Sequence, residues 1–136
     1  IGYAERLTDP VLMALRTRWL NFIRDAITLT PPDLLEWAEE FSKEKENIPE
    51  ILDTLRLAFR DIIIRSATGN TTHCAFPVLV ETLPNLRVGN ALNAIQTVDE
   101  AQLSIQQNVN PRLTAEHLLL TIRDALKTEP MHAAIR

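Results

Sequence analysis

Residues 48–66 read IPEILDTLRLAFRDIIIRS, and this stretch decides the fold class. Its apolar residues recur every three or four positions, which is the spacing of one face of an α-helix. Asn47 can cap the start of this helix, Pro49 fits its first turn, and Gly69 suits the left-handed position beyond its end. We therefore expect a helix to about Ser66, with a buried face formed by Ile48, Ile51, Leu52, Leu55, Ala58, Phe59, Ile62 and Ile63.

Two helices with clear start signals precede this one. Residues 9–29 begin with Asp9, a good N-cap, and with Pro10, which fits the first helical position. The next helix begins at Thr30, and Asp33 is spaced to complete a capping box with it. Aromatic residues on the apolar stripes favour core packing over the stacking of nucleobases: Trp19, Trp37, Phe41 and Phe59.

The chain beyond Gly69 starts with a weak pattern and then becomes periodic again. Over residues 70–87 we expect a loop and one short helix from about Pro77 to Leu83. A long helix follows over residues 88–108, and the pair Asn110-Pro111 predicts the start of a last helix that runs from Arg112 to about Lys127. The sum is five or six helices and no convincing strand, so the predicted fold class is all-α.

Some residues break the pattern of their own helix. Leu57 and Ile64 fall almost opposite the apolar face of the helix at residues 48–66, because successive helical residues are about 100° apart. That helix is therefore either central in the domain or in contact with a second partner. Asp99, Gln102 and Gln106 fall within or beside the stripe of the long helix, so its C-terminal half is expected to face something polar.

Length and composition fit one ordinary globular domain. The chain has 136 residues, of which 46% are hydrophobic and 24% charged. We expect residues 1–8 to end an upstream linker, residues 9–127 to form the helical core and residues 128–136 to fray. Because the chain begins with Ile1 rather than Met, we interpret it as a fragment of a longer protein, with functional parts upstream.

Charge and cysteine content exclude several function classes. The formal net charge is −4, the wrong sign for a domain that mainly holds nucleic acid, since phosphate binding depends on excess cation. A single cysteine, Cys74, excludes an intramolecular disulfide and a cysteine-rich zinc site. No apolar run is long enough to cross a bilayer. We therefore expect a cytoplasmic domain that binds neither nucleic acid nor membrane.

No catalytic motif is found in the sequence. A phosphate-binding loop, a dinucleotide fingerprint, a zinc-protease helix and a nucleophile elbow are all missing. His73 and Cys74 are the one adjacent pair of soft ligands. Because the side chains of sequence neighbours rarely point the same way, we do not expect this pair to form a metal site or a Cys–His nucleophile. The carboxylates at Glu39, Glu40 and Glu44 are expected on a solvated face, where the pKa stays ordinary. We expect a non-enzyme that uses no cofactor or metal.

Four stretches resemble a known family. ALNAIQTVDEAQ at residues 91–102, NVNPRL at residues 108–113 and the leucines at residues 118–120 resemble the C-terminal collar domain of bacterial DNA polymerase III clamp-loader subunits, most closely delta-prime. In that family a long helix carries two acidic residues followed by Ala. It leads into an N-x-N-P-R turn and then a leucine-rich final helix. LRLAFRDIII at residues 55–64 resembles the family's helix with an aromatic-Arg-Asp centre. Residues 70–87 match no family pattern.

The resemblance implies a non-catalytic oligomerisation domain. In the family, the C-terminal domains form a closed helical collar within a five-subunit AAA+ assembly that loads the sliding clamp during DNA replication. The partners would be the C-terminal domains of the other clamp-loader subunits, and the ATP-binding modules lie upstream. The gamma/tau subunit shares the collar architecture and is the second candidate within the family. The alternative function is an all-α adaptor or regulatory domain of an unrelated cytosolic protein, with a groove for a peptide or small ligand.

The candidate subunit interface combines outward apolar residues with the N-x-N-P-R turn. Asn110 can cap the last helix, and the Asn108 side chain can bond carbonyls left open by the preceding helix. Either the turn only sets the angle between two helices or it also contacts a neighbouring subunit. The candidates are Leu57, Ile64, Asn108, Asn110, Arg112, Leu113 and Leu120.

Overall fold

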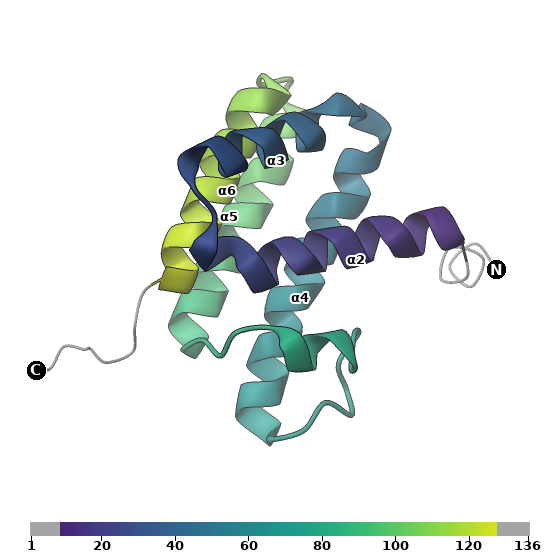
Figure 1. Ribbon diagram of the computed structural model, residues 1–136, viewed down its shortest axis with the longest axis vertical. Helices are drawn as coiled ribbons and strands as arrows, with labels where there is room; N and C mark the ends of the chain where they lie inside the picture. Colours follow the sequence, from purple (N-terminus) through teal and green to yellow (C-terminus); the bar gives the residue numbers. More distant parts are fainter. Residues whose placement is uncertain (1–8, 128–136) are drawn as a thin grey trace, which may run out of the picture.

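The computed structural model describes residues 9–127, which form helices joined by short turns and one longer loop (Figure 1). Within this range no strand is found, so the predicted all-α class is confirmed. The helices of the described range are α2 (Pro10–Asp25), η1 (Ala26–Thr28), α3 (Pro31–Lys43), η2 (Lys45–Asn47), α4 (Ile48–Thr68), η3 (Leu79–Thr82), α5 (Val88–Gln106) and α6 (Pro111–Lys127), where η marks a 3₁₀ helix. The predicted linker at residues 1–8 and the predicted tail at residues 128–136 lie outside the described residues.

Three of the predicted helix ends have the expected capping chemistry. The Asp9 carboxylate accepts a hydrogen bond of 2.9 Å from the Val11 N–H at the start of α2. Thr30 and Asp33 form the predicted capping box of α3, and the hydrogen bond from the Thr30 backbone holds the pKa of Asp33 below its ordinary value. Gly69 ends α4 at a φ of 76°, a left-handed conformation that glycine adopts without strain.

The predicted side-chain cap of α4 is wrong. Asn47 belongs to the 3₁₀ helix η2, and its backbone is already helical rather than extended. Its side-chain amide donates to the Glu44 carboxylate at 2.6 Å instead of accepting from the first turn of α4. The turn that joins α3 to α4 is therefore held together by its own side chains.

The packing order of the helices differs from their order in sequence. α5 lies between α4 and α6, while α3 packs against α6 and α2 crosses α4 (Figure 1). Helix α4 also contacts α3 and η3, so it is central in the domain. Of the two interpretations that the sequence left open for this helix, the fold supports the central one.

The core is one cluster that all five α-helices share. An aromatic group lies at the α2–α3 contact, where the Trp19 ring centroid is 4.9 Å from that of Trp37 and 6.0 Å from that of Phe41. Trp19 and Phe59 are both 0% exposed, as the helical stripes predicted. Edge-to-face ring pairs at these distances add to the free energy gained by burial.

Residues 70–87 form a loop with one short helix, as expected, but this helix is shorter than the predicted range from Pro77 to Leu83. The segment crosses the C-terminal half of α4 as an irregular loop, and its one helical part is the 3₁₀ turn η3 (Figure 1). Val80 of η3 is fully buried and anchors the loop to the core. Other apolar side chains of the loop are also buried in the core or packed against it, among them Phe76, Leu83 and Leu86, while polar contacts with α4 hold its backbone.

Candidate functional site

The turn between α5 and α6 is built by two asparagines with different roles. The Asn110 side chain accepts hydrogen bonds from the backbone N–H groups of Arg112 at 2.8 Å and of Leu113 at 3.2 Å, which confirms the predicted cap of α6. Asn108 has a left-handed backbone with a φ of 64°, which asparagine tolerates better than most residues. Its N–H bonds to the Ile105 carbonyl at 3.1 Å, and the next N–H, of Val109, bonds back to α5 at 3.0 Å.

These contacts correct one expectation about Asn108. We expected its side chain to bond the open carbonyls of α5, but within residues 9–127 the backbone of residues 108 and 109 makes those bonds in a Schellman motif. The left-handed residue reverses the chain direction between the two helices. Asn108 and Asn110 are both exposed. Their described contacts lie within the turn and at the ends of α5 and α6, so these contacts establish the geometry of the turn.

The first turns of α6 carry an ion pair and two outward leucines. Arg112 donates from Nε to the Glu116 carboxylate at 3.1 Å, four residues further on. Leu113 is 61% exposed and Leu120 is 43% exposed. Leu113 and Leu120 are seven residues apart, so they lie two turns apart on the same side of α6.

A hollow continues this apolar surface onto α3. It has a volume of about 150 Å³ and is lined by Pro31, Leu34, Leu35, Glu116 and Leu120. Leu35 is 48% exposed, although Leu34 beside it is buried. We call the exposed surface formed by Leu35, Leu113 and Leu120 the leucine face.

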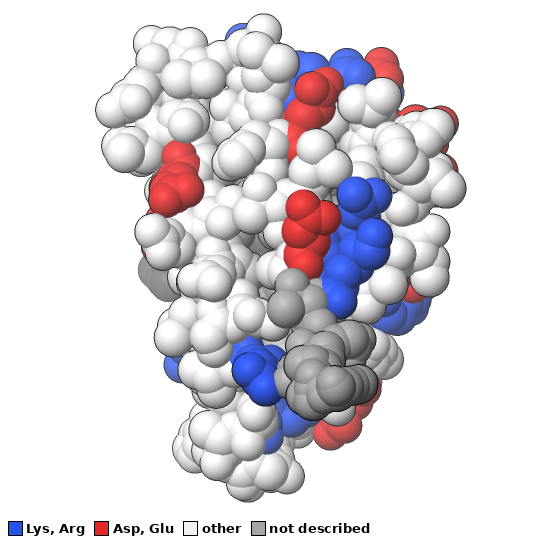
Figure 2. Space-filling view, turned by 90° about the vertical axis from the view of Figure 1, so that its left-hand side faces the viewer, with Lys and Arg blue, Asp and Glu red and all other residues white. Residues whose placement is uncertain are grey.

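The side of the molecule that carries α6 has uncharged surface and a few charged side chains, among them Arg112 and Glu116. Figure 2 looks onto the side of the molecule that carries α6 and shows wide uncharged surface between few Lys, Arg, Asp and Glu side chains. A second hollow, of about 290 Å³, lies between α5 and α6 and is lined partly by Val109, Leu113 and Ala101. Leu113 therefore borders one hollow at the α5–α6 turn, and Leu120 borders the other at the contact with α3.

The other two candidate apolar residues lie elsewhere. Leu57 and Ile64 are half-buried on α4, and α5 separates α4 from α6 (Figure 1). The structure therefore brings Leu120 together with Leu35 and places Leu113 two turns away on the same side of α6, but it does not join them to Leu57 and Ile64. Leu35 was missed as a candidate because its helix contributes to the core through the neighbouring Leu34.

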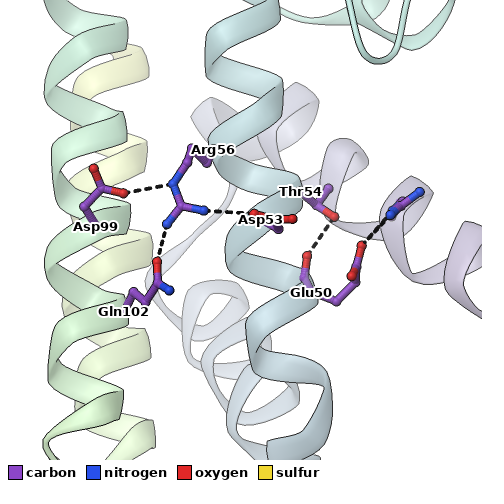
Figure 3. Close-up of polar contacts among 7 residues, drawn as sticks. Glu50, Asp53, Thr54, Arg56, Asp99 and Gln102 are labelled. Atoms are coloured by element: carbon purple, nitrogen blue, oxygen red, sulfur yellow. Dashed lines mark hydrogen bonds and ion pairs between the residues drawn. The ribbon is translucent and has the colours of Figure 1, made fainter. Parts of the chain in front are cut away.

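Polar links between helices form a second class of contact (Figure 3). Arg56 of α4 donates to Asp99 of α5 at 2.9 Å and to the side-chain oxygen of Gln102, and it also pairs with Asp53 at 3.0 Å. This explains why the predicted stripe of α5 contains Asp99 and Gln102. The expectation that this half of α5 faces something polar is confirmed for these two residues.

Sequence reasoning missed a buried ion pair between α2 and α4. Arg16 and Glu50 are both buried, and a guanidinium nitrogen lies 2.8 Å from the Glu50 carboxylate (Figure 3). Arg16 lies three residues before Trp19 and four after Leu12, which places it on the inner side of α2. The position of Arg16 on the inner side of α2 could have predicted the ion pair, because a buried charged side chain needs a partner of opposite charge.

Two charged residues of α4 that hold the loop at residues 70–87 were also not predicted from the sequence. The fully buried Asp61 carboxylate accepts hydrogen bonds from the N–H groups of Ala75 at 2.8 Å and Phe76 at 2.7 Å. The Arg65 guanidinium donates to backbone carbonyls of the same loop, among them that of Leu83 at 3.1 Å. Asp61 follows Thr54 and Ala58 at helical spacing, and both of those residues are buried.

Metal ligands do not converge in the described residues. Between residues 9 and 127, no group of three or more His, Cys, Asp and Glu side chains is placed to hold a metal ion. His73 is exposed, and the Cys74 Sγ lies 3.6 Å from the Asp61 carbonyl oxygen. Burial raises the pKa of the Cys74 thiol, and the charge of Asp61 raises it further, so the thiol is a poor nucleophile at neutral pH.

Comparisons with known proteins add no relative. No protein-family model, curated protein or solved structure matches the chain. Among the described helices, none has the length and apolar character that a bilayer crossing requires.

Proposed function

We propose that this chain is a non-catalytic oligomerisation domain of a DNA polymerase III clamp-loader subunit. The observation that carries the proposal is the leucine face, where three large side chains project from a domain whose core is already closed. Exposed apolar surface of this kind is typical of protein–protein contacts. The N-x-N-P-R turn and the leucine-rich last helix that resemble the clamp-loader collar lie directly beside it.

The partners in this proposal are the C-terminal domains of the other clamp-loader subunits. Such a partner covers Leu113 and Leu120 with its own apolar side chains and fills the hollow beside Leu35. Arg112 and Glu116 already pair with each other, so binding does not bury an unpaired charge there. In the complete assembly, the domain acts in the cytoplasm during DNA replication and contributes cohesion rather than ATP hydrolysis or DNA contacts.

The experiment is assembly of this chain with the collar domains of the other clamp-loader subunits of the same organism. Size-exclusion chromatography with light scattering gives the stoichiometry, and titration calorimetry gives the affinity. We expect Leu120→Asp to weaken assembly at least about tenfold, because interfaces depend on a few apolar anchors. The melting temperature of the isolated Leu120→Asp chain should change little, since Leu120 is exposed.

Val78→Asp is the matched control, because Val78 is also exposed but lies on the loop at residues 70–87. It adds the same charge and should assemble as the unmodified chain does. Failure of the unmodified chain to bind any collar domain contradicts the clamp-loader assignment. Assembly that Leu120→Asp does not weaken contradicts the role of the leucine face.

The alternative function is an all-α adaptor or regulatory domain of an unrelated cytosolic protein. One observation favours it, namely a groove that is large enough for a peptide and is lined by Leu12 and Leu15 of α2 and by Glu36 and Glu39 of α3. This function predicts peptide binding without any affinity for clamp-loader collar domains. The same assembly experiment therefore separates the two functions.

A further inference from the structure

A groove follows α2 where this helix faces α3 and the turn into α4. Two adjoining hollows of about 380 and 400 Å³ share Leu15, Glu44 and Asn47, so they form one continuous groove. Val11 and Trp19 mark the extent of its α2 side, and eight residues of helix correspond to about 12 Å. That length accommodates about two helical turns of another polypeptide.

The floor of the groove is apolar. Leu12 and Leu15 of α2 are half-buried, and Val11 is exposed at the rim. Trp19 lines the deeper part, and its indole N–H is buried without an acceptor among the described residues. Apolar surface that remains open between two packed helices favours a ligand with apolar side chains.

The walls of the groove are acidic. The lining contains five carboxylates, two of which are Glu36 and Glu39, against the two cations Arg18 and Lys43. Glu36 and Glu39 are exposed, and neither pairs with a cation of residues 9–127. The unbalanced carboxylates repel phosphate groups and attract a cationic ligand.

One cation of the chain already shows how these walls bind a guanidinium. Arg18 donates from Nε and Nη2 to both carboxylate oxygens of Glu40, and its guanidinium carbon lies 4.4 Å from the centroid of the Trp37 ring. The hydrogen bonds with Glu40 raise the pKa of Arg18 above its ordinary value. A carboxylate and an aromatic ring together form a common site for arginine.

We propose that this groove binds a basic amphipathic segment of a protein partner. Lysine or arginine side chains of the segment pair with Glu36, Glu39 and Glu44, and its apolar side chains cover Leu12 and Leu15. Charge complementarity selects this occupant over nucleic acid or an anionic membrane, because both of those present phosphates. The groove lies between α2 and α3, and the leucine face lies between α3 and α6, so this proposal does not rest on the clamp-loader assignment.

The test is a titration of the ¹⁵N-labelled 136-residue chain with a synthetic 12-residue peptide of the repeat Lys-Leu-Leu-Lys, followed by NMR. We expect shifts at Val11, Leu15 and Glu39 and at the Trp19 indole N–H, with a dissociation constant on the order of 10–100 μM at low salt. Binding should weaken as salt rises from about 50 to 300 mM, because the attraction is electrostatic. A peptide with glutamate in place of each lysine should not bind.

Variants localise the binding. Glu39→Lys combined with Glu44→Lys should weaken peptide binding at least about tenfold, since the two substitutions reverse one wall of the groove. Glu81→Lys combined with Glu100→Lys makes the same change in net charge at exposed positions outside the groove and should bind as the unmodified chain does. Equal losses in both double variants overturn the proposal. So do equal binding of the acidic peptide, shifts confined to the leucine face, or no shifts at about 1 mM peptide.

Discussion

The two halves of α4 are stabilised by different chemistry. In the N-terminal part, as far as Phe59, the side chains of Ile51, Leu55 and Phe59 are buried against other helices, which satisfy their own backbone hydrogen bonds. The C-terminal half is covered by the loop at residues 70–87, whose backbone groups bond to Asp61 and Arg65. Polar side chains in the N-terminal part, such as Glu50 and Arg56, bond to side chains of the neighbouring helices. Those of the C-terminal part must instead satisfy the backbone groups of irregular chain.

The largest expected effect is at Phe59, in the middle of α4. Phe59→Ala should lower the free energy of unfolding by about 3–5 kcal/mol, because it leaves a cavity in a closed core. Urea unfolding followed by circular dichroism measures the change. Leu92→Ala, at an exposed position of α5, is the control and should cost little. Similar losses in the two variants would show that Phe59 is not a core residue.

The next largest effect is expected at Asp61. Asp61→Ala removes the acceptor of the Ala75 and Phe76 N–H groups, so we expect a loss of about 2–3 kcal/mol. Hydrogen exchange of these two amides should accelerate more than exchange in the N-terminal half of α4. Ser66→Ala, at an exposed position of the same helix, is the control. Unchanged protection of both amides would contradict the role given to Asp61.

Arg65 should matter less, because its own side chain is only half-buried and water can replace part of its hydrogen bonds. We expect Arg65→Ala to cost about 1–2 kcal/mol, and Arg65→Lys to recover only part of that loss, because an ammonium cannot span several carbonyls as a guanidinium does. Thermal unfolding of both variants measures the difference. Full recovery by lysine would show that only the charge matters at this position.

The smallest expected effect is on the pH dependence of the melting temperature, through the Cys74 thiol of the loop at residues 70–87. Because burial raises the pKa of Cys74, the folded state keeps the thiol proton at a pH where the unfolded state loses it. The resulting stabilisation is complete below the ordinary pKa of 9.0 and is lost as the pH rises above it. Between pH 8 and pH 10, the melting temperature of Cys74→Ser should therefore fall less than that of the unmodified chain. Identical pH profiles would contradict the burial of the thiol.

The candidate surfaces differ in how well the sequence predicted them. Leu113 and Leu120 could be placed on the outer side of the last helix from spacing alone, and both are exposed. Leu57 and Ile64 had the same signal but are half-buried, because α4 is central. Leu35 could not be predicted to lie beside Leu120, since nothing in the local sequence shows that α3 packs on α6.

The sequence by itself determined the elements whose causes are local. The Asp9 cap, the capping box at Thr30, the left-handed Gly69 and the Asn110 cap all depend on residues within one turn of each other. The apolar stripes are local in the same sense, because side chains three or four positions apart share a helix face whatever the helix packs against. These signals were enough to predict the fold class and most of the helices.

Only the tertiary structure decided which helices are neighbours and which charged residues are buried. Asp61 binds a loop 14 and 15 residues away, and Arg16 pairs with a carboxylate 34 residues away. Two helices of the same amphipathic pattern can pack in several orders, and the total burial over the whole chain selects one of them. The leucine face and the acidic groove are what that packing leaves uncovered, so neither surface could be read from a single helix.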